Sequence, residues 1–126
     1  MVFDSDDSDL SASVNWVEAG GVTPVKDQQY CGSCWAFSAI GALEGAYFAK
    51  YGELKSFSEQ QLIDCDSHGD HIPYIYYYNY GCHGGGMIDA FRYFYDYHPM
   101  LESDYPYTSG NGEEIKKCLY SDSKAI

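Results

Sequence analysis

The sequence has 126 residues, of which 45% are hydrophobic, so it is long enough for one ordinary domain with an apolar core. Nineteen acidic residues against seven Lys and Arg give a formal net charge of -12, which argues against a nucleic-acid partner and an anionic membrane surface. The sequence also contains no apolar run long enough to span a bilayer.

The first 13 residues are acidic and rich in serine, with little apolar surface to bury. Such a composition predicts a disordered acidic leader over residues 1–13. A secretory signal peptide begins with basic residues followed by an apolar stretch, and this segment shows neither feature. We therefore expect no signal peptide within this chain.

A long apolar helix is predicted over residues 34–50. Ser33 is a suitable N-cap, because its hydroxyl can accept a hydrogen bond from an amide two or three residues later, and Gly52 is a natural stop. Apolar residues cover nearly the whole circumference, which is typical of a buried helix. Glu44 would be costly to bury there without a cation, so we expect one face of the helix to meet a partner surface. Cys34 lies at the N-terminal end, where the helix dipole favours the thiolate.

A second, short helix is predicted over residues 59–65. Ser58 and Gln61 have the spacing of a capping box, in which each side chain bonds the other residue's backbone amide. Phe57 and Leu62 occupy the two positions of a hydrophobic staple.

Residues 67–80 are rich in tyrosine, and we interpret them as a surface insertion. His68 and His71 could join the Cys31-x-x-Cys34 pair in a metal-binding module. A glycine and a proline in the same stretch make a helical presentation of the two histidines difficult. We therefore expect no metal.

A third helix is predicted over residues 87–97, ending before Pro99. Five of its apolar residues recur at helical spacing and define one face: Met87, Ala90, Phe91, Phe94 and Tyr95. We expect Phe91 and Phe94 to lie in the core.

Gln28 and the octapeptide Cys-Gly-Ser-Cys-Trp-Ala-Phe-Ser at 31–38 resemble the nucleophile segment of papain-like cysteine proteases. The resemblance runs from Val14 to Asp66 and resumes from 81 to 118. It implies a mainly α structure over residues 14–120, followed by a tail at 121–126. This would be the helical left domain of the α+β papain-like fold, with the β-rich right domain absent from this chain.

The resemblance also implies roles for individual residues. Cys34 would be the nucleophile, and the Gln28 amide together with the backbone N–H of Cys34 would stabilise the oxyanion. Gly84 and Gly85 would run beside the bound peptide, since glycine permits close backbone approach. Met87 would help to line a substrate side-chain pocket.

Five cysteines suggest two disulfides and one spare thiol, although spacing alone does not assign the pairs. An intracellular chain with five reduced thiols is the alternative. The resemblance implies the pairs Cys31–Cys82 and Cys65–Cys118, which leaves Cys34 free, and a lysosomal or extracellular location.

In papain-like enzymes the catalytic His and its orienting Asn lie roughly 130 to 150 residues after the nucleophile, beyond Ile126. His83 precedes three glycines and is interpreted as a loop residue rather than a base. The sequence thus predicts the nucleophile-bearing half of a cysteine endopeptidase, inactive by itself and needing no cofactor. Its expected partners are a peptide or protein substrate, the right domain with His and Asn, and a propeptide or cystatin-like inhibitors. The alternatives are a non-catalytic peptide- or inhibitor-binding fragment and the metal-binding module.

Overall fold

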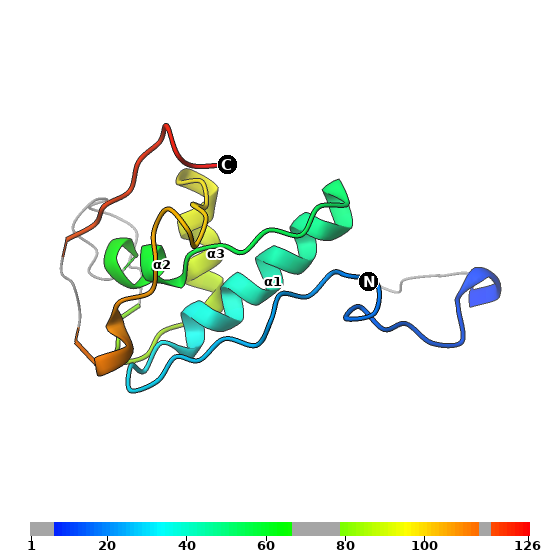
Figure 1. Ribbon diagram of the computed structural model, residues 1–126, viewed down its shortest axis with the longest axis horizontal. Coiled ribbons are helices and arrows are strands. Elements are labelled where there is room, and N and C mark those ends of the chain that lie inside the picture. Colours follow the sequence, from blue (N-terminus) through cyan, green and yellow to red (C-terminus); the bar gives the residue numbers. More distant parts are fainter. Residues whose placement is uncertain (1–6, 67–78, 114–116) are drawn as a thin grey trace.

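The computed structural model describes residues 7–66, 79–113 and 117–126. The helices of these residues are α1 (Cys34–Tyr51), α2 (Glu59–Cys65) and α3 (Met87–Asp96), with single 3-10 turns at Asp7–Asp9 and Ser109–Asn111 (Figure 1). Over the described ranges there is no β-strand, and backbone pairing between segments is limited to isolated bridges. The mainly α architecture expected from the sequence is therefore confirmed, and each α-helix begins and ends within one residue of its predicted bounds.

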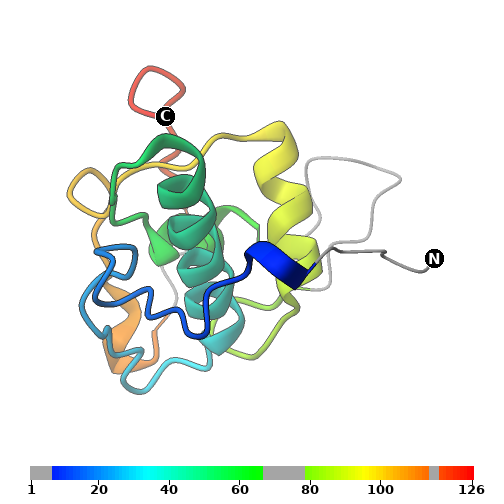
Figure 2. The same cartoon turned by 90° about the vertical axis from the view of Figure 1, so that its right-hand side faces the viewer.

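Helix α1 forms the centre of the molecule and packs against both α2 and α3. Figure 2 shows α3 on one side of α1 and the extended N-terminal segment on the other. The buried apolar cluster draws on all three helices and the loops between them: Cys31, Trp35, Ala36, Ala39, Ile40, Phe57, Leu62, Ile63, Cys82, Ala90 and Tyr93.

The prediction that α1 is buried all round is only half right. Its face toward α2 and α3 is buried, but Gly41, Ala42, Ala46 and Ala49 on other sides are exposed. The two short helices cover one side of α1 and the N-terminal segment covers part of another, so a strip of small residues on α1 stays exposed. This is the bare face that the sequence led us to expect.

Glu44 of α1 is buried, and Lys26 supplies the cation that its burial requires. The Lys26 ammonium lies 2.9 Å from Glu44 and 2.7 Å from Glu59 at the start of α2. Thr23 donates a further hydrogen bond of 2.6 Å to Glu44. Burial disfavours the Lys26 ammonium, but its hydrogen bonds to Glu59 and Glu44 outweigh this and raise its pKa. These contacts tie the N-terminal segment to α1 and α2.

Only half of the predicted capping box forms at α2. Ser58 Oγ accepts from the Gln61 amide at 3.0 Å, as expected. The Gln61 side chain does not return to Ser58, because it donates to the His98 carbonyl at 3.0 Å and accepts from the Met100 amide at 2.8 Å. The Ser58 amide bonds the Met100 carbonyl instead, at 3.0 Å. A segment distant in sequence thus completes the cap.

The predicted core face of α3 is displaced. Ala90 and Tyr93 are its buried residues, whereas Phe91 is 43% exposed and Phe94 only partly buried. Small Ala90 permits close packing, and the buried Tyr93 hydroxyl has a polar partner in the Gln61 side chain at 3.3 Å. The expectation that Phe91 belongs to the core was wrong.

Outside the helices, the structure tests only part of the predicted leader, surface insertion and tail. Residues 8–13 are exposed, and the leader and the 121–126 tail stay predictions. Most of the predicted surface insertion, residues 67–78, lies outside the described residues. Asn79, near its end, is 1% exposed and therefore does not belong to the surface. No helix in the described ranges has the length and apolarity needed to cross a membrane.

Candidate active site

Cys34 is the first residue of α1 and carries the chain's one free thiol, which is exposed. The other four cysteines form the pairs Cys31–Cys82 and Cys65–Cys118, with S–S distances of 2.08 and 2.05 Å. These are the pairs that the resemblance implied, and the alternative of five reduced thiols does not hold in this structure. A sulfur atom at a helix N-terminus lies where the dipole favours negative charge.

The backbone amide of Cys34 has no acceptor among the described residues. It is one of the first-turn N–H groups that an α-helix leaves unpaired. Because the amide belongs to the same residue as the exposed thiol, it can donate to an oxygen atom brought to the sulfur.

Gln28 lies in the loop before α1 and is half-buried. One N–H of its side chain donates to the Cys31 carbonyl at 2.9 Å, which holds the amide against the nucleophile loop. The Gln28 carbonyl accepts from the Cys31 amide at 3.4 Å and from the Tyr107 hydroxyl at 2.5 Å. The second N–H of the Gln28 side chain remains for another acceptor.

Ser33 does not cap α1 through its side chain. Its hydroxyl lies 3.5 Å from the Cys31 carbonyl and 3.4 Å from the Tyr107 hydroxyl, and the residue is fully buried. The predicted N-cap bond was wrong because Tyr107, remote in sequence, draws the hydroxyl away from the helix amides. Tyr107 therefore contacts both Gln28 and Ser33. The sequence signal for Tyr107 is its place in the Tyr-Pro-Tyr stretch at residues 105–107.

The glycine segment that follows Cys82 lies against the nucleophile loop. The Gly32 amide donates to the Cys82 carbonyl at 2.8 Å, and the Gly84 amide donates to the Gly32 carbonyl at 3.1 Å. A Cβ atom on Gly32 would strike that Cys82 carbonyl, so the close approach requires glycine. Gly84 is therefore bonded to Gly32, which precedes Cys34 by two residues.

Gly85 is exposed, and neither its amide nor its carbonyl has a partner in the part of the chain that the structure describes. A Cβ atom there would meet the Trp35 ring and the Asn79 side chain. Met87 follows at the start of α3 and is 44% exposed. The structure therefore brings an unpaired donor and acceptor close to the helix that carries Cys34.

The metal-binding alternative loses its cysteine pair, because Cys31 is bonded to Cys82 and cannot supply a thiolate. The described residues contain no group of three potential metal ligands. His68 and His71 lie outside the residues that the structure describes. His83 is exposed, and its amide donates to the Tyr80 carbonyl at 2.9 Å, which fits a loop residue.

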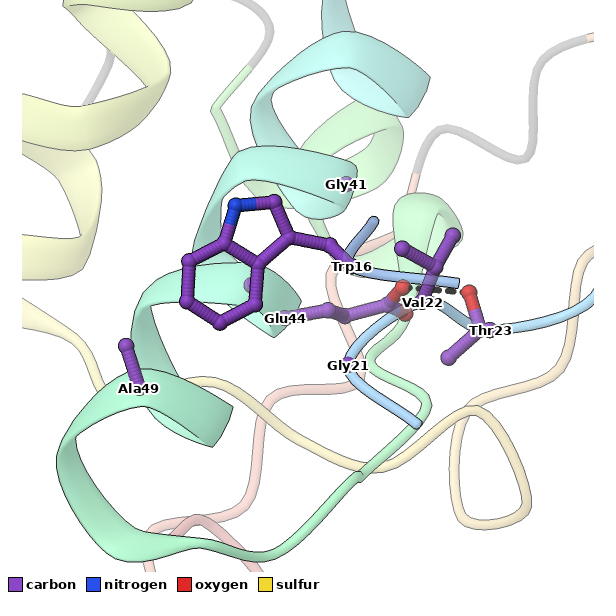
Figure 3. Close-up of a pocket in the computed structure, with 8 residues that line it drawn as sticks. Trp16, Gly21, Val22, Thr23, Gly41, Glu44 and Ala49 are labelled. Carbon is purple, nitrogen blue, oxygen red and sulfur yellow. Dashed lines mark hydrogen bonds between the residues drawn. The ribbon is translucent and has the colours of Figure 1, made fainter. Parts of the chain in front are cut away.

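The bare face of α1 borders a separate hollow of about 320 Å³. Figure 3 shows the Trp16 ring beside this face and Glu44 pointing toward Thr23. Neither Cys34 nor Gly85 lines the hollow, whose walls are Trp16, Gly21, Val22, Thr23, Gly41, Glu44, Gly45 and Ala49. It therefore lies apart from the candidate site.

Comparisons with known proteins agree with this geometry. Residues 10–126 match a family model described as "Papain family cysteine protease". The chain is 48% identical over 120 residues to "Probable cysteine protease RD19C" of Arabidopsis thaliana, covering 94% of this chain and 31% of the relative. It is 50% identical over 120 residues to "Digestive cysteine proteinase 3" of Homarus americanus, covering 94% and 34%.

A solved structure of digestive procathepsin L 3 from Tenebrio molitor larval midgut is also similar. Its TM-score is 0.79 at 43% sequence identity, covering all of this chain and 37% of that structure. The chain thus spans about a third of the length of the curated relatives it matches.

Proposed function

Because this chain belongs to the papain family of cysteine proteases, we propose that it is the nucleophile-bearing part of a cysteine endopeptidase that cleaves peptides or proteins. The observation that supports this most strongly is the exposed, unpaired thiol of Cys34 at the N-terminus of α1, beside a loop that carries Gln28. A free thiol alone does not indicate a catalytic site, but this one lies beside two hydrogen-bond donors suited to acyl transfer, the Cys34 amide and the Gln28 side chain.

Cys34 acts as the nucleophile in this proposal. Its thiolate attacks the substrate carbonyl carbon, and the negative charge that moves to the carbonyl oxygen is stabilised by two donors, the Cys34 amide and the Gln28 side chain. The amine then leaves with a proton, and water hydrolyses the resulting thioester. Removal of one oxyanion donor typically costs about 100- to 1,000-fold in kcat.

Gly84, Gly85 and Met87 bind the substrate. The unpaired amide and carbonyl of Gly85 suit an extended peptide, which offers a main-chain acceptor and donor in return. Exposed Met87 at the start of α3 offers an adaptable apolar surface for a substrate side chain.

A base is also required, because the thiol must lose a proton and the leaving amine must gain one. We place that His and its orienting Asn in a further, β-rich domain that packs on the bare face of α1, with residues 14–120 as the helical domain. The relatives, about three times as long as the matched region, leave room for such a domain.

The proposal extends to location and regulation. Two disulfides favour an oxidising compartment, in keeping with a lysosomal or extracellular protein. A propeptide and cystatin-like inhibitors are the proposed protein partners. The name of the solved neighbour, a procathepsin, supports the propeptide.

The test is peptide hydrolysis by the complete protein that carries these residues. Cys34→Ala should abolish turnover, and Gln28→Ala should lower kcat by about 100-fold or more. Gln29→Ala, a change at the exposed neighbouring glutamine, is the matched control and should retain most activity. Turnover that survives Cys34→Ala would overturn the proposal, and peptide binding without cleavage would indicate a binding protein instead.

A further inference from the structure

Asn79 lies buried between the end of α2 and the glycine segment, and its side chain bonds both. Its Nδ2 donates to Oδ2 of Asp66 at 2.5 Å, and its Oδ1 accepts from the Gly86 amide at 2.6 Å. Asn79 is 1% exposed and Asp66 is 3% exposed, so water does not compete at either bond. No role was assigned to either residue from the sequence.

The chemistry of the two neighbours determines the orientation of the Asn79 amide. A backbone N–H only donates, so the Asn79 atom that faces Gly86 must be Oδ1, and Nδ2 then donates to Oδ2 of Asp66. Asp66 supplies the acceptor that keeps Nδ2 turned away from the glycine segment.

The Gly86 bond in turn orients the carbonyl of Gly85. The peptide unit between Gly85 and Gly86 is planar and trans, so its N–H and C=O point in opposite directions. Asn79 Oδ1 holds the N–H on the buried side, beneath Gly85. The Gly85 carbonyl therefore points away from Asn79, and Gly85 as a residue is exposed.

A glycine segment needs such an anchor. Gly84, Gly85 and Gly86 have no side chains with which to hold their own conformation, and glycine loses more conformational freedom on ordering than any other residue. On one side the segment is held by Gly32, through the Gly84 amide. The Asn79 side chain holds the other side.

We propose that Asn79, oriented by Asp66, is a positioning residue that aims the Gly85 carbonyl at an extended peptide, so that it accepts a main-chain N–H of the substrate. This rests on the proposed protease function and on Gly85 as a binding residue. Asn79 does not touch the substrate and acts only through the peptide unit that it holds.

The test compares peptide substrates with depsipeptides, each of which lacks one main-chain N–H because an ester oxygen replaces the amide nitrogen. The complete protein should cleave the all-amide peptide about three- to tenfold faster, in kcat/KM, than the depsipeptide altered at the residue facing Gly85. Asn79→Ala should lower this ratio to about one by raising KM for the all-amide peptide. The ratio comes from one preparation, so it does not depend on the folded fraction.

A charge swap distinguishes positioning from simple packing. In an assay at pH 8, where Asp66 is ionised, Asn79→Asp places two carboxylates against each other and should lower the ratio. The double variant Asp66→Asn with Asn79→Asp restores one amide and one carboxylate and should recover it. Asn15→Asp, at an exposed asparagine of the N-terminal segment, is the matched control and should leave the ratio unchanged.

The outcomes separate the two proposals. A complete protein that cleaves no peptide overturns the protease function, and this inference with it. A protein that cleaves peptides but keeps its amide-to-ester ratio in Asn79→Ala, or fails to recover it in the double variant, overturns the positioning role alone.

Discussion

The Lys26 ammonium lies 2.9 Å from Oε1 of Glu44, a carboxylate only 3% exposed. Glu59, 1% exposed, shares the same ammonium at 2.7 Å. Burial raises the pKa of Glu59 to about 7 despite its hydrogen bond to Lys26. One cation therefore serves two buried carboxylates in the cluster that joins the N-terminal segment to α1 and α2.

Replacement of Lys26 by Met should be strongly destabilising at pH 7.5. The change leaves the Glu44 and Glu59 carboxylates buried without their cation, for which a cost of about 3–5 kcal/mol in the free energy of unfolding is expected. Urea denaturation measures it. Adding Glu59→Gln to Lys26→Met should recover part of the loss, because one of the two charges disappears.

Lys55→Met is the control for this prediction. Lys55 lies 3.9 Å from Glu53, whose side chain is 68% exposed, so its loss should cost less than about 1 kcal/mol. Equal effects of the two lysine substitutions would contradict the importance of the buried cluster.

Asp66 should make stability decrease as the pH rises from about 4 to about 7. Burial raises the pKa of Asp66 from 3.8 to about 7, although the Asn79 hydrogen bond lowers it and the Asp89 charge raises it further. The folded protein thus holds a proton that the unfolded chain releases. The resulting stabilisation is complete below pH 4 and is lost by pH 7, to an extent of up to ~4 kcal/mol.

The measurement is the unfolding free energy of the wild type minus that of Asp66→Asn across this pH range. The difference should fall with rising pH. Asp96→Asn, at an exposed carboxylate, is the control for the substitution itself and should change the free energy of unfolding by less than about 0.5 kcal/mol. A difference for Asp66→Asn that rises with pH would show that the folded state favours the Asp66 carboxylate.

Cys34 should be the one thiol that iodoacetamide labels in the unreduced protein. It is exposed and unpaired, whereas the other four cysteines are in disulfides. Mass spectrometry of the labelled protein should show one adduct, and Cys34→Ala should show none. A disulfide-linked peptide that contains Cys34 would refute both the pairing and its proposed role.

Tyr107→Phe should lower kcat/KM severalfold. The Tyr107 hydroxyl holds the Gln28 carbonyl at 2.5 Å, so its loss loosens the loop that presents the oxyanion donor. A stability loss of about 1–2 kcal/mol should accompany it. Tyr95→Phe, at a tyrosine that is 89% exposed, is the control and should change neither quantity. An unchanged kcat/KM in Tyr107→Phe would show that Gln28 does not depend on this bond.

These 126 residues, produced alone, should not hydrolyse peptides at a useful rate. General acid–base catalysis is typically worth about 100- to 10,000-fold, and we place the base in the further domain. Adding that domain as a separate chain should restore some turnover if the bare face of α1 docks on it. Peptide cleavage by the isolated residues that is lost in Cys34→Ala would mean that a base lies within them.

Local patterns predicted the local structure well. Ser58 caps α2 through its own hydroxyl, and Gly52 ends α1 in the left-handed conformation with φ of 70°. Both signals act over one helical turn, so they can be read without knowledge of the fold. The site motif from Gln28 to Ser38 is likewise contiguous, which is why sequence alone could propose Cys34 and Gln28.

The errors arose where a side chain had two possible partners. Ser33 was expected to cap α1, but its hydroxyl lies beside the Tyr107 hydroxyl instead. The Gln61 side chain was expected to bond the Ser58 amide, but it bonds the backbone of residues 98 and 100. Phe91 fits the helical spacing of α3 but faces outward, because Tyr93 finds a buried polar partner in Gln61. In each case the side chain bonds a partner that is distant in sequence.

The sequence by itself determined the three helices, the local cap of α2 and the residues proposed for chemistry, because each depends on neighbours within a few positions. Only the tertiary structure decided which face of α1 stays bare, which cation accompanies Glu44, and that Asn79 lies between Asp66 and the glycine segment. Lys26 and Glu44 are 18 positions apart, and Asp66 and Asn79 are 13 apart. The hydrophobic periodicity of the sequence does not predict such pairs, because they form only when the packing of the core brings distant segments together.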